Sequence, residues 1–220
     1  STRSAKLAPT NISTLISKLL NSEENDYKQF SYQKIYWSGI YSRAHIYEQE
    51  HDRFKAGDAD GMVAGAINSS ANVLRASLQI LKTAPESKLV SAFFLVVVPN
   101  CDMGANGTFI FSDAGLNQSP NAEELAAIAE SSALSFELLV QQEPIIAMLS
   151  HSTKGSAKHV EVDKVVEATN LVKAANPNLK IDGELQSDAA IVPEIAASKA
   201  PDSDVAGKAN VLVFPDLDAG

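Results

Sequence analysis

Short apolar runs alternate with longer amphipathic stretches along most of the chain, from residue 56 onward. A short apolar run is typical of a buried strand, whereas apolar positions that recur every three or four residues indicate a helix. The runs that predict strands lie at residues 62–66, 89–98, 109–111, 145–149 and 211–214. The stretches that predict helices lie at residues 69–84, 120–142, 159–176 and 187–200.

Local signals mark the ends of two elements. Ser119 is a candidate N-cap for the helix at 120–142, because Pro120 follows at the first helical position. Asn106 and Gly107 predict the turn of a hairpin. Strands separated by helices of this length form a parallel or mixed sheet that is covered on both faces, so we expect an α/β fold.

Residues 1–54 differ in composition from the rest. All five tyrosines and the single tryptophan lie between Tyr27 and Tyr47. The apolar spacing predicts two helices, at residues 11–30 and 31–54, with an amphipathic face on the second. This face either packs against the rest of the protein, which we favour, or binds a partner.

The overall composition is that of a soluble globular protein, with 45% hydrophobic and 20% charged residues. A net charge of −9 argues against nucleic acid and against anionic membrane surfaces as binding partners.

Cys101 is the single cysteine, so no intrachain disulfide can form and a reducing compartment is expected. The longest apolar run, at residues 89–99, is too short to span a bilayer, and no signal-peptide pattern is present. We expect a cytoplasmic protein.

The segment at residues 57–75 combines features of an anion site. Its glycines allow close approach of the backbone, and Ser69 and Ser70 open a helix whose N–H groups favour an anion. Arg75 follows on this helix as the only arginine after residue 55, and its planar guanidinium suits phosphate or carboxylate. A surface ion pair is the alternative role for Arg75.

A second candidate is the serine- and glycine-rich loop at residues 149–159. Ser150 and Ser152 either cradle a phosphate, with Lys154 and Lys158 adding charge, or only turn the chain and cap the next helix. The spacing of glycine and lysine does not match a P-loop.

Histidines and carboxylates give weaker signals. His151 and His159 lack an obvious third ligand, so we expect no metal site. Asp182, Glu184 and Asp188 form an acid/base pair or a divalent-cation site in one interpretation, and solvated helix caps in the other. None of these loops is specific for one reaction by itself.

Taken together, the loops resemble those of one family. The strings DADGMVAGA, LQILKTAP, NAEELAAIA, AMLSHSTKGSAKH, IDGELQSDAAIVPEIAASKAP and VAGKANVLVFPDLDAG follow the order and spacing of the phosphate acetyltransferase, or phosphotransacetylase, family. The resemblance covers residues 55–220, whereas residues 1–54 are unmatched. It implies an acyltransferase that moves an acetyl group reversibly between acetyl-CoA and inorganic phosphate, giving acetyl phosphate and CoA.

The resemblance also implies an architecture. The family has a two-domain fold similar to that of the isocitrate and isopropylmalate dehydrogenases, with a mixed, mainly parallel sheet, an active site in the cleft and a homodimeric assembly. Residues 1–85 would be the N-terminal part of domain I, with an atypical helical segment at 1–54. Residues 86–220 would be a truncated middle domain II. No cofactor is bound permanently, coenzyme A is a substrate, and no metal takes part.

The family mechanism gives roles to particular residues. The coenzyme A thiol, deprotonated with help from an aspartate, attacks the carbonyl carbon of acetyl phosphate; arginines hold the phosphoryl group and a serine assists the oxyanion. The phosphate-site arginine of the family matches Arg75, which we predict to be catalytic, and the hydroxyl residues before it match Ser69 and Ser70 as substrate-binding residues. The candidate cleft residues are Ser150, Ser152, Asp216 and Asp218.

One part of the family pattern is missing. The catalytic Ser-Arg-Gly-Cys segment of the family, and the aspartate after it, have no match in these 220 residues. We therefore expect an incomplete fold, from an enzyme of which this chain is a part. The alternative is a non-catalytic module that binds an anion or coenzyme A.

Overall fold

The computed structural model describes residues 35–37, 61–63, 69–83 and 89–220. They fall into two compact units, one with residues 89–220 and one with the described residues before them. The break next to Lys88 lies close to residue 86, where we expect domain II to begin. The assignment of these units to domains I and II stays a prediction.

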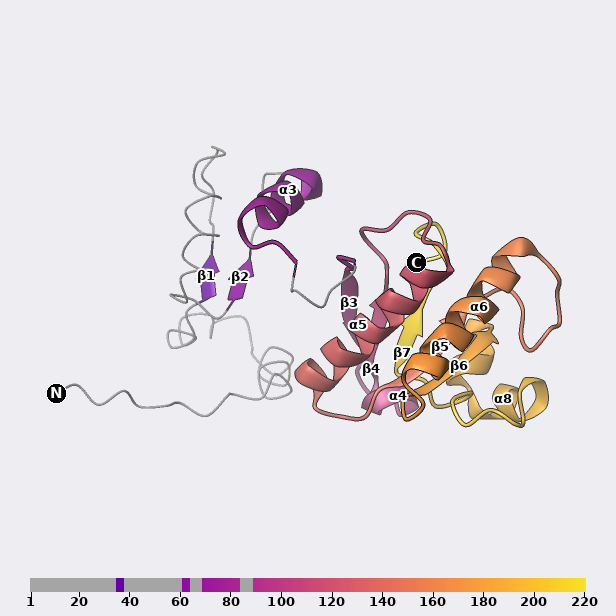
Figure 1. The fold of residues 1–220 in the computed structure, drawn as a ribbon. Helices are drawn as coiled ribbons and strands as arrows, with labels where there is room; N and C mark the ends of the chain where they lie inside the picture. Colours follow the sequence, from indigo (N-terminus) through magenta and orange to yellow (C-terminus); the bar gives the residue numbers. More distant parts are fainter. Residues whose placement is uncertain (1–34, 38–60, 64–68, 84–88) are drawn as a thin grey trace. The chain divides into compact units, whose positions relative to one another are not determined.

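The larger unit is built on a five-stranded sheet with the strand order β3-β4-β7-β5-β6 (Figure 1). Its strands are β3 (Phe93–Val97), β4 (Thr108–Ser112), β5 (Ile145–Leu149), β6 (Lys180–Leu185) and β7 (Val211–Val213). Only the β3–β4 pair is antiparallel. Because neighbouring parallel strands end at one edge, the loops after β5, β6 and β7 gather there.

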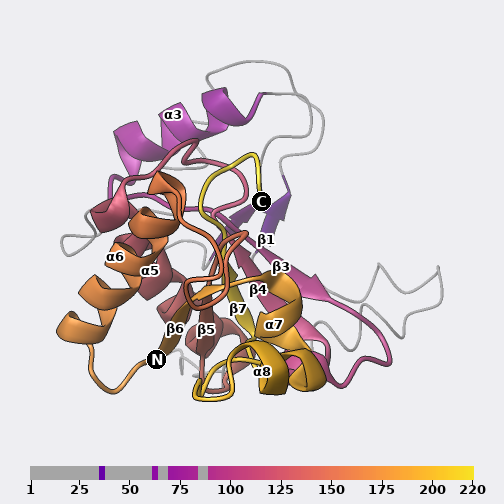
Figure 2. The same cartoon turned by 90° about the vertical axis from the view of Figure 1, so that its right-hand side faces the viewer.

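Helices cover both faces of this sheet (Figure 2). The helices are α4 (Met103–Asn106), α5 (Ala122–Val140), α6 (Val160–Ala175), α7 (Ser187–Ile191) and α8 (Pro193–Lys199). Ile146 and Met148 belong to the core under α5 and α6, and Ala147 and Leu149 to the core under α7 and α8. Successive residues of β5 thus face opposite cores, which explains its continuous apolar run.

The predicted fold class is confirmed in this unit: it is α/β, with a mixed and mainly parallel sheet between helices. The likeness to the isocitrate and isopropylmalate dehydrogenases stays a prediction. None of the described helices is both long and apolar enough to cross a membrane.

The N-cap of α5 is Asn121, so the prediction of Ser119 is wrong. The side-chain oxygen of Asn121 accepts a hydrogen bond from the Glu124 amide at 2.8 Å, and the Glu124 carboxylate accepts one from the Asn121 amide at 2.9 Å. This reciprocal capping box satisfies two backbone N–H groups at the start of the helix. Pro120 lies before the cap and not in the first turn.

The predicted hairpin consists of β3 and β4, joined by residues 98–107 instead of a two-residue turn. Asn106 and Gly107 both have left-handed backbone angles, with φ of 52° and 81°. A Cβ atom at Gly107 would lie 2.2 Å from the carbonyl oxygen of Val98, so only glycine fits where the chain returns so closely.

Strand β6 is not predicted by the apolar pattern, because its sequence KIDGEL carries two carboxylates. Asp182 and Glu184 are nevertheless buried, at 6% and 4% exposure. The helix expected at 187–200 is two helices, α7 and α8. Val192 between them has extended backbone angles, φ −103° and ψ 113°, because a residue before proline avoids the helical region.

In the smaller unit, β1 (Ile35–Trp37) pairs in parallel with β2 (Gly61–Val63), and α3 spans Ser70–Ile80. The strand β1 contradicts, at these positions, the helix expected at 31–54. Isoleucine, tyrosine and tryptophan are residues that favour strands, which accounts for the difference.

Other expectations fall outside the described residues. These are the helix at 11–30, the rest of the helix at 31–54 with its amphipathic face, and residues 64–66 of the strand expected at 62–66.

Candidate functional site

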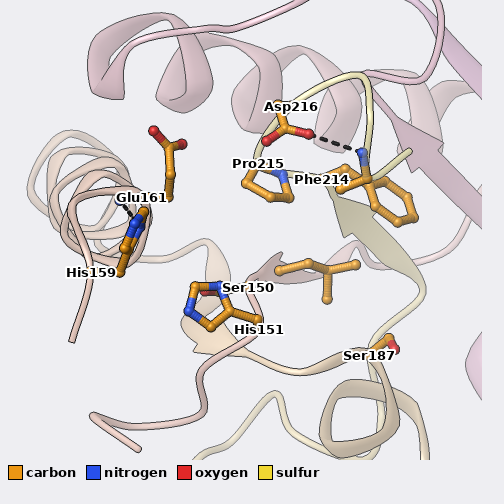
Figure 3. Close-up of a pocket in the computed structure, with 10 residues that line it drawn as sticks. Ser150, His151, His159, Glu161, Ser187, Phe214, Pro215 and Asp216 are labelled. Atoms are coloured by element: carbon orange, nitrogen blue, oxygen red, sulfur yellow. Dashed lines mark hydrogen bonds between the residues drawn. The ribbon is translucent and has the colours of Figure 1, made fainter. Parts of the chain in front are cut away.

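A pocket of about 410 Å³ opens at the edge of the sheet where β5 and β7 end and where α6 and α7 begin (Figure 3). It is lined by Leu149, Ser150, His151, His159, Glu161, Ser187, Phe214, Pro215, Asp216 and Ala219. Its size is within the range of small-molecule sites, and ligands of open α/β sheets bind outside the carboxyl ends of strands. The pocket is therefore the candidate functional site of the larger unit.

His159 shapes one side of the pocket as the N-cap of α6. Its Nδ1 accepts a hydrogen bond from the amide of Glu161 at 3.2 Å. Because Nδ1 accepts, the proton of a neutral His159 is on Nε2, which can donate to a ligand. The ring of His151 lies edge-on to that of His159, with centroids 6.0 Å apart (Figure 3). Among the described residues, no three His, Cys, Asp or Glu side chains are grouped so that they could hold a metal ion.

Two carboxylates also line the pocket, and both have partners. The ammonium of Lys164 hydrogen-bonds to Glu161 and so lowers the pKa of this carboxyl, which stays charged. The carboxylate of Asp216 accepts a hydrogen bond from the amide of Ala219 at 2.9 Å, which closes the loop after β7 (Figure 3).

The loop after β5 is attached to the end of β6. The amide of Ser150 donates to the carbonyl of Leu185 at 2.9 Å, and the amide of Gln186 donates to the hydroxyl of Thr153 at 2.9 Å. Ser152 is fully buried, and its hydroxyl donates to the Glu184 carboxylate at 2.8 Å. Strand β6, which the apolar pattern does not predict, thus supports the loop after β5, which is a candidate site in the sequence.

Asp182 stabilises this support and does not line the pocket. Lys154 and Lys173 both reach its carboxylate, at 2.7 and 2.8 Å. Burial by itself would raise the pKa of Asp182, but hydrogen bonds from Lys154, Lys173 and Ser203 outweigh burial and lower the pKa to about 2. A carboxylate paired in this way cannot act as a general acid or base near neutral pH.

Asp188 and Glu184 are the other two carboxylates for which the sequence left an acid/base or cation site open. Asp188 lies in the first turn of α7, where a hydrogen bond from Lys199 lowers its pKa. Glu184 is buried under the loop after β5. Neither lines the pocket.

The predicted cleft residues separate into two groups. Ser150 and Asp216 are brought together in the pocket. Ser152 is buried in the hydrogen bonds below the loop, and Asp218 is exposed; neither of these two lines the pocket.

The other predicted site residues lie in the smaller unit, on α3. Ser69 is the N-cap, and its hydroxyl accepts a hydrogen bond from the Asn72 amide at 3.4 Å. Ser70 is the first residue of the helix. Arg75 is exposed, and its Nη1 donates to the Asn72 side chain at 3.2 Å, which uses one of five guanidinium N–H groups. The first turn of α3 has no acidic residue. The role of these residues in binding substrate stays a prediction.

Several of the residues that line the pocket are not predicted from the sequence. Glu161, Ser187, Phe214 and Pro215 stand next to chain positions where a strand ends or a helix begins. His159 is considered only as a metal ligand. The signal that could have found them is position: the residues directly after parallel strands, and the first residues of the helices that follow.

The fold and the pocket define a class of protein: an α/β protein with a pocket at the carboxyl edge of a mainly parallel sheet. Residues 50–220 match the model of the phosphate acetyl/butaryl transferase family. The chain therefore belongs to the phosphate acetyl/butaryl transferase family, and the family predicted from the loop sequences is confirmed.

Individual relatives agree with this. A phosphate acetyltransferase of Acetivibrio thermocellus is 63% identical over 166 residues, which are 76% of this chain and 50% of the relative. One of Thermoanaerobacterium thermosaccharolyticum is 58% identical over 166 residues, 76% of this chain and 51% of the relative. The crystal structure of a phosphotransacetylase from Streptococcus pyogenes has a TM-score of 0.72 and 48% identity, covering 80% of this chain and 52% of that chain. The chain spans about half the length of the curated relatives it matches.

Proposed function

We propose that this chain is part of a phosphate acetyltransferase, which transfers an acetyl group reversibly between acetyl-CoA and inorganic phosphate. The names of the relatives favour this enzyme over the non-catalytic binding module. The observation that carries the proposal is the pocket at the carboxyl edge of β5 and β7 in a chain of this family.

The chemistry of the pocket suits the uncharged end of the substrate. Leu149, Phe214 and Pro215 supply apolar surface, and the carboxylates of Glu161 and Asp216 would repel a phosphate group. The acyl and pantetheine part of acetyl-CoA is apolar and amide-containing, so it matches such a lining. Ser150 and Asp216 then act as the wall of the cleft and not as the base that deprotonates the thiol.

The phosphate would be bound by the predicted residues of α3. Arg75 is exposed, and among the described residues only the Asn72 side chain accepts from its guanidinium; the N-terminus of α3 offers N–H groups next to Ser69 and Ser70. In this arrangement the guanidinium neutralises the phosphate that leaves when the thiolate of coenzyme A attacks the acetyl carbon.

The remaining expectations belong to the same proposal. The enzyme is a cytoplasmic homodimer with the two-domain architecture of the isocitrate and isopropylmalate dehydrogenases. It uses coenzyme A as a substrate, binds no permanent cofactor and needs no metal.

The test is thioester formation from acetyl phosphate and CoA by the full-length enzyme that contains this chain, with the Arg75→Ala and Arg75→Lys variants beside it. Loss of the Arg75 guanidinium should lower kcat/KM by about two to three powers of ten, with a large part in the KM for acetyl phosphate. Arg75→Lys should recover part of the loss. If the enzyme binds CoA but forms no thioester, the binding module is correct and the proposal is wrong.

A further inference from the structure

Glu184 is a buried carboxylate that the pocket itself does not use, since it is 4% exposed and does not line the pocket. A buried charge is costly unless hydrogen bonds compensate it. One oxygen, Oε1, accepts from the hydroxyl of Ser152 at 2.8 Å and from the amide of Gly155 at 2.6 Å. Both partners belong to the loop after β5, so the charge is compensated by this loop.

Glu184 makes a further contact with residues 150–157, which we call the serine loop. The carbonyl of Glu184 accepts from the amide of Lys154 at 3.2 Å. The Ser152 hydroxyl, while donating to Glu184, accepts from the amide of Ala157 at 3.0 Å. The hydrogen bond from the Ala157 amide to Ser152 therefore joins the end of the serine loop to a residue near its start.

The conformation of the serine loop also needs an external anchor. Lys154 and Gly155 both have left-handed backbone angles, with φ of 49° and 82°. Such angles are unfavourable for lysine, and a Cβ at Gly155 would meet nothing within 4 Å, so packing does not impose them. The hydrogen bonds to Glu184 hold the loop at these two residues together with those from the Lys154 ammonium to Asp182 and to the carbonyl of Gly183.

We propose that Glu184 is the positioning residue of the pocket: it fixes the serine loop, and through the loop it fixes Ser150 and His151 against the ligand. Both of these residues line the pocket, and they stand at the start of the loop that Glu184 holds. This inference rests on the proposed function, because the ligand it assigns is the acyl-pantetheine end of CoA. Glu184 is not a catalytic residue, because it does not line the pocket in which the ligand would bind.

Removing the charge while keeping the shape tests the idea. Glu184→Gln keeps a carbonyl oxygen that can accept but weakens both hydrogen bonds, because charge-assisted bonds are the stronger ones. We expect amide hydrogen exchange of residues 153–157 in the full-length enzyme without ligand to become about tenfold faster, since local opening sets the exchange rate. The KM for CoA in the full-length enzyme should rise about tenfold, while the KM for acetyl phosphate stays unchanged.

Two further variants separate positioning from stability. Ser152→Ala together with Glu184→Gln should raise the KM for CoA by less than the product of the two single effects, because the two residues share one hydrogen bond. Val172→Ala removes buried methyl groups from α6 and should lower the melting temperature. It should change neither the exchange of the loop nor the KM for CoA.

The outcomes are distinct. Unchanged exchange of the serine loop in Glu184→Gln overturns the proposal, whatever the enzyme does. Faster amide exchange of the serine loop with an unchanged KM for CoA also overturns the proposal, since the loop would then not position residues that bind the ligand. If wild-type enzyme forms no thioester, the proposed function is wrong, and CoA binding measured by calorimetry in the same variants then decides whether the loop serves the ligand.

Discussion

Lys164 donates a hydrogen bond to the carbonyl oxygen of Pro215 at 3.0 Å and so joins helix α6 to the loop after β7. The same ammonium pairs with Glu161 at 2.5 Å, and the lysine side chain is only 13% exposed. Glu161 and Pro215 line the pocket from two different elements. One cation therefore holds two walls of the pocket together.

Lys164→Met keeps most of the aliphatic stem and removes this cation. The pKa of Glu161 should rise towards its ordinary value of 4.5, because the hydrogen bond from Lys164 is the main reason that it is low. Loss of the two bonds should lower the free energy of unfolding by about 1 kcal/mol. Carbon-detected NMR titration of the Glu161 carboxyl and thermal melting measure these changes.

Lys180→Met is the matched control. Lys180 pairs with Glu143 at 2.6 Å, but both side chains are about half exposed, at 48% and 61%. An exposed pair contributes about 0–1 kcal/mol, so this variant should melt close to wild type and bind CoA normally. Equal losses of stability in the two lysine variants would contradict the role of Lys164 in joining α6 to the loop after β7.

Asp182→Asn should destabilise the protein in a pH-dependent way. The pKa of Asp182 is about 2 in the folded protein against an ordinary 3.8, so its contribution is complete above pH 5 and is lost as the pH falls towards 2. Because Lys154 and Lys173 are 37% and 47% exposed, water screens the pairs, and we expect a loss of about 1–2 kcal/mol at pH 7. Denaturant unfolding at several pH values between 2 and 7 measures the difference. A gap between variant and wild type that stayed constant down to pH 2 would exclude this assignment.

The sequence predicts the elements whose stabilising contacts are local or periodic. The apolar run of β5 and the helical spacing of α5 need only neighbouring residues, and both elements form. The family could also be predicted from the sequence, because the loops of this family have characteristic sequence motifs.

The sequence could not predict elements that depend on distant partners. In the sequence, Asp182 and Glu184 look like loop residues. In the fold, Lys154 and Ser152, which lie 28 and 32 positions earlier in the chain, compensate their charges and allow them to be buried in a strand. The same holds for the pocket. Ser150 and Asp216 could be predicted from the sequence because they lie in loops after strands. Glu161 could not, because it lines the pocket only where α6 packs next to the loop after β7.

Asn121→Ala should lower the free energy of unfolding by about 1 kcal/mol, because it removes the side-chain half of the capping box of α5. Ser119→Ala is the control that separates the two candidate caps. Ser119 is exposed, so its loss should change stability by less than about 0.5 kcal/mol. Urea unfolding of both variants gives the comparison, and the reverse order of the two losses would restore Ser119 as the cap.

His159→Asn separates the two roles that the structure gives to His159. Asparagine is among the strongest N-cap residues, so its side chain should replace Nδ1 as acceptor for the Glu161 amide, and the melting temperature should equal or exceed that of wild type. The imidazole Nε2 and the edge-on contact with His151 would be lost from the pocket. If the ring contacts the acyl-pantetheine end of CoA, affinity should fall about fivefold to tenfold, as expected for one lost hydrogen bond. His159→Ala should lose both the cap and the ligand contact. Wild-type affinity for CoA in His159→Asn, measured by calorimetry on a fully folded sample, would limit His159 to a cap and leave the pocket without its donor on this side.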